Sequence, residues 1–537
     1  MSTHHQHRRA FLQRAAGLVT TGAALPLGLS LGAMTRAAAQ STGNGYKALV
    51  CIFLSGGNDA FNTVLATDTG SWGHYNDQRC PTDGSTVIAL PAPGVAANLS
   101  AAGSSPDRLG GVLPISHAGR TVNAGRQFAL HPALTRTQQM YQAGNVAVLA
   151  NVGPLTRPTT KADYQNVAVS KPTKLYSHND QQSTWQTLQP EGATPGWGGL
   201  MGDNLRSING SGRSPSDADL IQRLFTCMTP STAGPWLAGQ QVLPYQSSLT
   251  SILGLGSAGT IYGNAGLQSA AAAMLGQLNT SGQTTIPANN LFLADHQRIV
   301  QRALKANDLL GASLSPLGTG PWSTSGVTDP NSDNLLKYTS PVDGTRKLNG
   351  LALQLQMVAR LIDLNRTANL GMTRQLFMVN LGGFDTHANQ ISDHADRMAQ
   401  LDHAMSYFDA VLRNMPSTGD MRGQVTTFTA SEFGRSFTSN GDGTDHGWGG
   451  HHFIMGGAVR GTDVYGAFPQ YSSVDSTGSF SSPDQLQNGV LLPTTAVEHY
   501  AYTLGKWMDV PDAALRGFLP NLSQFDSATY NLGFLNT

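Results

Sequence analysis

Four short apolar segments, each followed by glycine or polar residues, set the pattern of this chain. They are residues Lys47–Leu54, Val146–Val152, Leu376–Leu381 and Val425–Thr429. Each segment is too short for a typical helix, and continuous apolar runs of this length are typical of strands that are buried on both faces of a parallel sheet. The pattern therefore predicts a buried core sheet.

Helical spacing of apolar residues marks the segments between these strands. It is present in Leu291–Leu310, Leu348–Asn369 and Ser392–Arg413. Strands that alternate with amphipathic helices are typical of an α/β fold. We expect a central mixed, mostly parallel sheet that is flanked by helices.

Two regions interrupt this alternation. Asp68–Gly125 is rich in Gly, Pro and Ser, and Ser207–Gly350 mixes apolar helical pieces with polar linkers. We interpret both as excursions from the sheet that form lid-like insertions. The predicted organisation is therefore one α/β domain over residues 40–537, with an insertion around residues 207–350.

The N-terminus has the pattern of a twin-arginine export signal. Arg8-Arg9 precedes Phe11-Leu12, an uncharged and moderately apolar stretch runs from Ala15 to Thr35, and Ala37–Ala39 offers a cleavage site. We predict a signal peptide over residues 1–39, recognition by the twin-arginine export machinery, and a periplasmic or secreted mature protein. No later apolar run reaches membrane-spanning length, so no stable membrane span is expected after cleavage.

Charge and cysteine content narrow the possible functions. Lys+Arg and Asp+Glu balance at 33 each, which removes any electrostatic case for nucleic-acid binding. No C-x-x-C motif occurs, so a thiol redox centre is not expected. Cys51 lies in an apolar run and is interpreted as a core residue, while Cys80 and Cys227 could pair in an oxidising compartment.

The candidate chemistry is concentrated late in the chain. Six of the 15 histidines lie between His387 and His452. Asp385 and His387 follow a predicted strand and can point the same way in an extended segment. Carboxylates and imidazoles together are typical ligands of a divalent metal ion. The alternative is a Gly-Gly turn before a polar helix start.

A second cluster follows the next predicted strand. Glu432 stands at the end of this strand, and a glycine-rich loop leads to Asp445-His446. We predict Glu432 and His446 as metal ligands, with Asp445 either a ligand or a carboxylate that orients an imidazole. Of His451 and His452, one is expected to face the site and the other to be structural.

Four further candidate residues each have two interpretations. Asp59 follows a strand and two glycines, so it is either a metal ligand or a turn aspartate that caps the next element. Arg435 either clamps an anionic oxyacid or pairs with Glu432. Ser177 is a speculative nucleophile and His178 a possible ligand, although both can be ordinary loop residues.

These motifs, taken in order, resemble one large family of exported bacterial proteins, the domain of unknown function fifteen-oh-one family. The resemblance rests on the twin-arginine leader and on residues 53–59 (FLSGGND), 383–387 (GFDTH), 431–435 (SEFGR) and 445–447 (DHG). That family is similar to the alkaline phosphatase and sulfatase superfamily. The resemblance implies an alkaline-phosphatase-like sheet with a divalent-metal site, and it would make Asp59, Asp385, His387 and His446 metal ligands.

The chain departs from that superfamily at two positions. Glu432 stands where the superfamily often has Asp, and Phe433 stands where it has a ligand histidine. The expected function is an exported, metal-dependent hydrolase of a phosphate or sulfate ester, with an anionic ester as the partner and Zn, Ca, Mg or Mn as the ion. The alternative is a non-catalytic envelope or surface protein that keeps the sheet and a structural metal.

Overall fold

The structure is a computed structural model that describes residues 45–80, 86–118, 121–252, 291–311, 313–416 and 418–536. Residues Tyr46–Thr537 form one compact unit. The predicted signal peptide lies outside the described residues. No helix in the described ranges has both the length and the apolar character needed to cross a bilayer.

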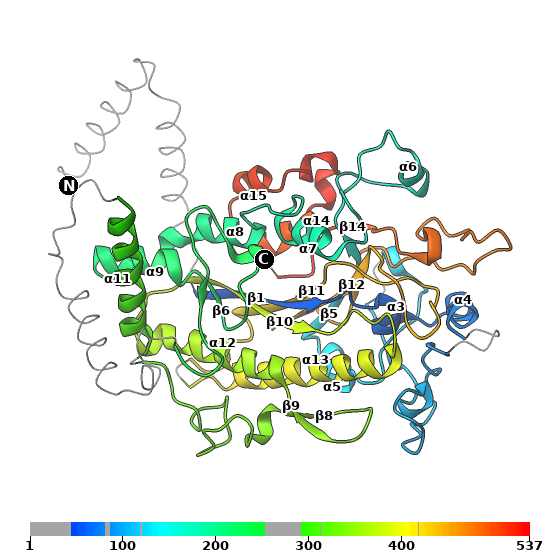
Figure 1. Cartoon of the computed structure of the whole chain (residues 1–537), viewed down its shortest axis with the longest axis horizontal. Coiled ribbons are helices and arrows are strands. Elements are labelled where there is room, and N and C mark those ends of the chain that lie inside the picture. Colours follow the sequence, from blue (N-terminus) through cyan, green and yellow to red (C-terminus); the bar gives the residue numbers. More distant parts are fainter. Residues whose placement is uncertain are drawn as a thin grey trace. The chain divides into compact units, whose positions relative to one another are not determined.

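A nine-stranded sheet forms the centre of this unit (Figure 1). Its strand order is β13 (Val464–Tyr465), β5 (Val146–Gly153), β12 (Gly450–Met455), β11 (Val425–Ala430), β1 (Lys47–Ser55), β10 (Arg374–Gly382), β6 (Cys227–Thr229) and β7 (Tyr245–Gln246), with β14 (Thr495–Ala496) beside β5. All neighbours pair in parallel except β12, which is antiparallel to both β11 and β5. The sheet is therefore mixed and mostly parallel, which confirms the predicted class.

The four predicted core strands correspond to β1, β5, β10 and β11. Their side chains are buried on both faces, as the continuous apolar runs predicted. In β1, for example, Val50 and Ile52 face one apolar core, and Leu49 and Cys51 face the other. Strand β12, which contains His451 and His452, was not predicted, because a glycine-rich loop precedes it and its apolar part is short.

Helices cover both faces of the sheet (Figure 1). One layer contains α12 (Gly350–Thr367), α13 (Gln390–Arg413) and α5 (Thr135–Gln142); the other contains α7 (His178–Thr187), α8 (Trp197–Leu205), α14 (Val497–Trp507) and α15 (Asp512–Phe518). The predicted helices over residues 348–369 and 392–413 are confirmed as α12 and α13. Helix α11 (Leu291–Gly311) confirms the third.

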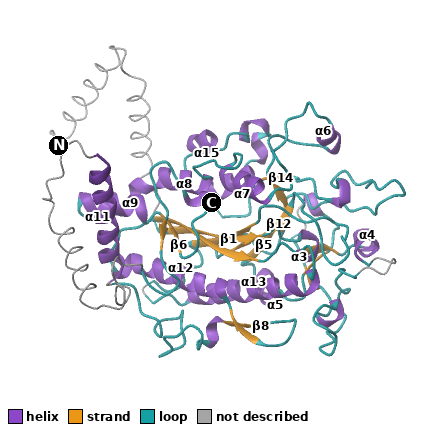
Figure 2. Cartoon of the chain, viewed as in Figure 1, coloured by secondary structure: helices purple, strands orange, loops and turns teal. Residues whose placement is uncertain are grey.

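The predicted insertion around residues 207–350 contributes to the central sheet, since β6 and β7 both come from it. It also contains α9 (Pro215–Leu224), α11 and a hairpin of β8 (Lys337–Thr339) and β9 (Arg346–Leu348) beneath α13 (Figure 2). Residues 253–290 of this stretch lie outside the described residues. The stretch around residues 207–350 is therefore not only an insertion, because two of its strands belong to the central sheet.

The other predicted excursion, Asp68–Gly125, begins with α4 (Thr69–Arg79). Its strand β3 (Leu113–Ile115) forms a small sheet with the strands that flank this region, β2 (Val64–Ala66) and β4 (Phe128–Leu130). Two short helices lie elsewhere, α3 (Ala60–Thr63) directly after β1 and α6 (Lys161–Gln165) after β5.

Cys51, Cys80 and Cys227 are all free thiols, so the possible Cys80–Cys227 pair is not formed.

Candidate functional site

The candidate site lies where three neighbouring parallel strands end. Strands β10, β1 and β11 are adjacent and parallel, so their carboxyl ends meet at one edge of the sheet. Two glycines follow β1, and a Cβ on Gly56 would lie only 2.4 Å from the backbone nitrogen of Asp385. A Cβ on Gly57 would lie 2.1 Å from the Phe433 ring. Glycine at both positions lets the three strand ends approach closely.

Three histidines surround the Asp385 carboxylate at this edge. The Nε2 atom of His178 lies 3.4 Å from Asp385 Oδ2. The Nε2 atoms of His387 and His446 lie 3.2 Å and 3.3 Å from Asp385 Oδ1. His387 Nε2 and His446 Nε2 are 2.9 Å apart. Donor atoms of His178, Asp385 and His446 all lie within 4.8 Å of one another, which is compatible with one bound metal ion.

The opposite nitrogen of each imidazole faces an acceptor. His178 Nδ1 lies 3.1 Å from Glu432 Oε1, and His387 Nδ1 lies 3.4 Å from Asp445 Oδ1. His446 Nδ1 lies 2.7 Å from the carbonyl oxygen of Tyr176. Metal-binding histidines are typically oriented in this way by a carboxylate or carbonyl on their other nitrogen. All three Nε2 atoms are thereby directed at Asp385.

The tautomer of His446 follows from its partner. A carbonyl oxygen only accepts hydrogen bonds, so Nδ1 of His446 carries the proton and donates to Tyr176. Burial lowers the pKa of His446, and the nearby charges of Arg435, His178 and His387 lower it further. In the neutral ring, Nε2 therefore presents a lone pair to the Asp385 carboxylate, an arrangement that a shared cation stabilises.

Glu432 supports His178 and is not one of the residues that surround Asp385. Its Oε1 accepts from the backbone N–H of Gly56 at 2.7 Å and faces His178 Nδ1. Its Oε2 is buried and has no hydrogen-bond partner among the described residues. The hydrogen bond to Glu432 raises the pKa of His178, and the Asp385 charge adds to this effect. Glu432 thus holds His178 in place and leaves one carboxylate oxygen available.

We expect Glu432→Gln to lower the pKa of His178. The hydrogen bond to the carboxylate is the main cause of the raised value, and an amide oxygen is a weaker acceptor without charge. The pKa is measured by NMR titration of the His178 ring in metal-free protein. Glu191→Gln, at an exposed position, is the control. An unchanged His178 pKa in Glu432→Gln would contradict the assigned role.

Arg435 is a structural support for Asp385 and not an exposed anion clamp. Its side chain is fully buried and donates to the carbonyl oxygens of Gly57 at 2.9 Å, Thr444 at 3.1 Å and Phe384 at 3.0 Å. It also donates to the Asp385 carboxylate. Partial burial opposes ionisation of Asp385, but the hydrogen bond and charge of Arg435 outweigh it and lower the pKa of this carboxyl group.

Asp59 takes the capping role that was the alternative to metal binding. Its Oδ1 accepts from the backbone N–H of Phe61 at the start of α3. Its Oδ2 lies 2.5 Å from Arg79 Nη1, and both side chains are fully buried. The Gln390 amide also donates to Oδ2. The structure therefore places Asp59 in a buried ion pair and not among the residues around Asp385.

Three other candidate residues have different surroundings from those expected. The Ser177 hydroxyl donates to Asp180 Oδ2 at 2.8 Å, so it is directed at its own helix and not at Asp385. His451 and His452 are both buried in β12, where His451 stacks on Phe468. Neither histidine belongs to the group around Asp385, although one of the two was expected to face the site.

Two contributors were missed or underestimated from the sequence. Arg79 lies in a region interpreted as an excursion, and no local motif marks it as the partner of Asp59. Tyr176 acts through its backbone carbonyl and has φ +73°, a conformation that its residue type does not indicate. Both act through contacts that are remote in sequence.

The residues around Asp385 fit a divalent metal ion. Donor atoms held about 2.0–2.2 Å from a tetrahedral ion lie roughly 3.3–3.6 Å apart. The distances from Asp385 to the three Nε2 atoms are 3.2–3.4 Å. The compact donor group is formed by His178, Asp385 and His446, and His387 Nε2 lies 2.9 Å from His446 Nε2, closer than two ligands of one ion. Three nitrogen donors with one carboxylate suit zinc or another transition metal better than calcium or magnesium.

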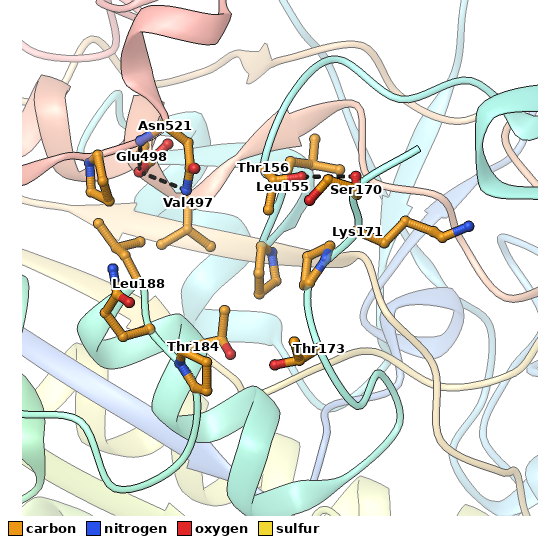
Figure 3. Close-up of a pocket in the computed structure, with 15 residues that line it drawn as sticks. Leu155, Thr156, Ser170, Lys171, Thr173, Thr184, Leu188, Val497, Glu498 and Asn521 are labelled. Atoms are coloured by element: carbon orange, nitrogen blue, oxygen red, sulfur yellow. Dashed lines mark hydrogen bonds between the residues drawn. The ribbon is translucent and has the colours of Figure 1, made fainter. Parts of the chain in front are cut away.

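A separate cavity of about 260 Å³ lies between the end of β5, α7 and α14 (Figure 3). Glu498 and Asn521 lie on one side of it and Lys171 on the other (Figure 3). None of the histidines around Asp385 lines this cavity. Glu498 is buried, and its Oε2 has no hydrogen-bond partner among the described residues. Burial raises the pKa of Glu498 from 4.5 to about 7.

This raised pKa predicts a pH-dependent stability. The folded state binds the Glu498 proton more tightly than the unfolded chain, so this contribution is full below pH 4.5 and is lost as pH rises through about 7. We expect Glu498→Gln to remove that loss and to be more stable than the parent at pH 8 by roughly 1–3 kcal/mol. Urea unfolding at several pH values measures the difference. An identical pH dependence in the variant would contradict this account, and exposed Glu191→Gln is again the control.

Comparison with known proteins supports the sequence resemblance over part of the chain. Residues 343–519 match the family model described as "Protein of unknown function (DUF1501)". No curated protein shows a significant match. The matched segment contains Asp385, His387, Glu432, Arg435 and His446, whereas His178 lies outside it. The resemblance to the DUF1501 family is therefore supported for residues 343–519, the part of the chain that carries most of the candidate site.

Proposed function

We propose that this protein is an exported, metal-dependent hydrolase of an anionic ester, with a phosphate or sulfate ester as substrate. One observation carries the proposal: three imidazoles direct Nε2 at a single carboxylate while an acceptor faces each Nδ1. His178, His387, His446 and Asp385 would hold the ion. When bound, a divalent ion polarises an ester oxygen and lowers the pKa of a bound water.

The other residues of the site position these ligands. Glu432 orients His178, and Asp445 orients His387. The Tyr176 carbonyl keeps the proton of His446 on Nδ1, which leaves Nε2 free. Arg435 keeps Asp385 ionised and fixes it to the carbonyls of the neighbouring turns. His387 and Asp385 are about half exposed, so a substrate can reach this edge of the sheet.

The class of substrate rests on the motif resemblance to the alkaline phosphatase and sulfatase superfamily. We extend that resemblance to an alkaline-phosphatase-like fold and to export through the twin-arginine pathway to the periplasm or the exterior. Low and balanced charge is in keeping with a small ester and not with a highly anionic polymer.

Replacement of Arg8 and Arg9 by lysine should retain the protein in the cytoplasm, which cell fractionation measures.

The test of the activity is a panel of phosphate and sulfate esters, assayed with the mature protein after addition of Zn²⁺, Mn²⁺, Mg²⁺ or Ca²⁺. We expect turnover that is lost with a chelator and restored by a transition metal. Absence of bound metal together with absence of turnover across the panel would overturn the proposal.

A second candidate is a non-catalytic envelope protein with a structural metal ion. Two observations favour it: the Ser177 hydroxyl is bound to Asp180, and the Arg435 guanidinium is buried and not open to a substrate anion. This reading predicts tight metal binding and a large drop in thermal stability with a chelator, but no turnover of any ester.

A further inference from the structure

We propose that Gln390 is a positioning residue for the metal site, because its buried amide joins both ligand-bearing loops to the Asp59–Arg79 ion pair. The inference rests on the proposed metal site. Gln390 is the first residue of α13 and is fully buried. Among the described residues its side chain hydrogen-bonds to Thr386, Thr444 and Asp59 and to none of the four proposed ligands, so its effect on them passes through neighbouring residues.

The amide oxygen of Gln390 connects the two loops that carry the ligands. Its Oε1 accepts from Thr444 Oγ1 at 2.5 Å and faces Thr386 Oγ1 at 3.4 Å. Thr386 lies between Asp385 and His387 in the chain, and Thr444 lies two residues before His446. One buried oxygen atom therefore holds both segments.

The amide nitrogen of Gln390 sets the orientation of this contact. Nε2 donates to Asp59 Oδ2 at 2.5 Å. An ionised carboxylate only accepts hydrogen bonds, so the nitrogen must face Asp59 and the oxygen must face the two threonines. Asp59 is itself held by both terminal nitrogens of Arg79, at 2.5 Å and 3.0 Å. The orientation of the Gln390 amide is thus determined by a buried ion pair.

Backbone contacts make the two loops one unit above Gln390. Thr444 N–H donates to the Thr386 carbonyl oxygen at 3.1 Å, and Gln390 N–H donates to the Asp442 carbonyl oxygen at 3.1 Å. Arg79 adds hydrogen bonds to the carbonyl oxygens of Ser436 and Phe437, on the chain that leads from β11 to Thr444. The ligand atoms are partly exposed, but the residues beneath them are fixed from the interior.

The geometry also gives Asp59 a role that differs from direct metal binding. The Asp59 carboxylate orients the Gln390 amide, and this amide holds Thr386 in the loop after β10 and Thr444 in the loop after β11. Loss of this connection should leave the four ligands in the chain but relax their relative placement. Changes in residues that orient metal ligands typically reduce metal affinity about 10–100-fold. Because Gln390 acts one residue further away, we expect a loss near the lower end of that range.

The experiment compares Gln390→Met with Gln356→Met in the full-length mature protein. Gln356 is a matched control, a buried glutamine of α12 whose amide donates to Trp322 O and Ser323 Oγ. Co²⁺ affinity is measured by titration, the ligand field by the visible absorption of bound Co²⁺, and stability by thermal unfolding. We expect Gln390→Met to weaken Co²⁺ binding about tenfold and to change the absorption spectrum. Gln356→Met should change only the unfolding temperature.

A charge-conserving exchange supplies the second arm. Gln390→Glu places two carboxylates in contact and should also weaken Co²⁺ binding. In the double variant Asp59→Asn/Gln390→Glu, the asparagine amide can donate to the new carboxylate, so affinity should recover in part relative to Gln390→Glu alone. Recovery is incomplete because the asparagine NH₂ group then also faces Arg79 Nη1. If Gln390→Met does not fold, Thr444→Val removes the same contact from the other side.

The outcomes separate this inference from the proposed function. Parental protein that binds no Co²⁺ would overturn the metal site itself and the inference with it. Parental protein that binds Co²⁺ while Gln390→Met has the same affinity and spectrum as the parent would overturn the role of Gln390 only. Equal effects of Gln390→Met and Gln356→Met on Co²⁺ binding would also overturn it, because a general loss of packing would then explain both.

Discussion

Asp385→Asn should abolish metal binding more completely than any other single conservative change in this protein. The carboxylate faces the Nε2 atoms of three histidines at 3.2–3.4 Å and supplies the negative charge at their centre. A neutral amide keeps the shape but loses the charge, and its NH₂ group would face imidazole nitrogens. We expect metal affinity to fall by at least about 100-fold, with ester turnover falling in parallel. Isothermal titration and metal analysis measure the metal affinity, and the panel of esters measures the turnover.

The control for this change is Asp475→Asn. Asp475 is an exposed turn residue whose carboxylate accepts from Thr477 and Ser479. It should leave metal affinity unchanged. If Asp385→Asn binds metal as tightly as the parent, the ion does not lie at this carboxylate and the assignment of the site is wrong.

Arg79→Met should give the largest loss of stability. It leaves the Asp59 carboxylate buried without its cation, and it removes donors to the Ser436 and Phe437 carbonyls. Loss of one partner of a buried ion pair typically costs about 3–5 kcal/mol. Urea unfolding should show a decrease of that size, and metal affinity should also fall because the Gln390 contact loses its anchor.

Two other variants serve as comparisons for the loss of stability in Arg79→Met. Arg516→Met removes an exposed pair with Asp512 one helical turn away, which should cost far less stability because water screens both charges. The double variant Asp59→Asn/Arg79→Met should be less damaging than Arg79→Met, since no unpaired charge is left in the interior. A loss in Arg79→Met no larger than that in Arg516→Met would show that the buried pair contributes little.

The sheet and part of the site could be predicted because their signals are local. Continuous apolar runs identified β1, β10 and β11, and parallel strands end at a common edge. Asp385, His387 and His446 follow these strands, so their convergence could be expected from the sequence. The spacing of Asp385 and His387 also indicated a shared direction.

The remaining contacts of the site depend on residues that only the fold brings together. His178 reaches Glu432 from a position 254 residues earlier in the chain, and a polar loop before a helix gives no signal of that contact. Whether Asp59 takes a metal or a guanidinium depends on Arg79, the last residue of α4, whose sequence carries no signal of this pairing. Local sequence shows which chemical groups are available, whereas tertiary packing decides how they pair.

Strand β12 illustrates the same limit at the level of secondary structure. Its His451-His452 pair resembles a ligand motif beside a glycine-rich loop. In the sheet, however, successive side chains face opposite sides. His451 stacks on Phe468 and His452 packs near Trp185 and Tyr500, so both are core residues. Burial lowers the pKa of each to about 3, which keeps both neutral.

The most direct test of the metal site is anomalous diffraction from crystals of the mature protein grown with Zn²⁺, recorded on both sides of the zinc absorption edge. We predict an anomalous peak within coordination distance of Asp385 and of the Nε2 atoms of His178, His387 and His446, at about 2.0–2.2 Å from each donor. Absence of a peak at this position, or a peak held by other residues, would contradict the account.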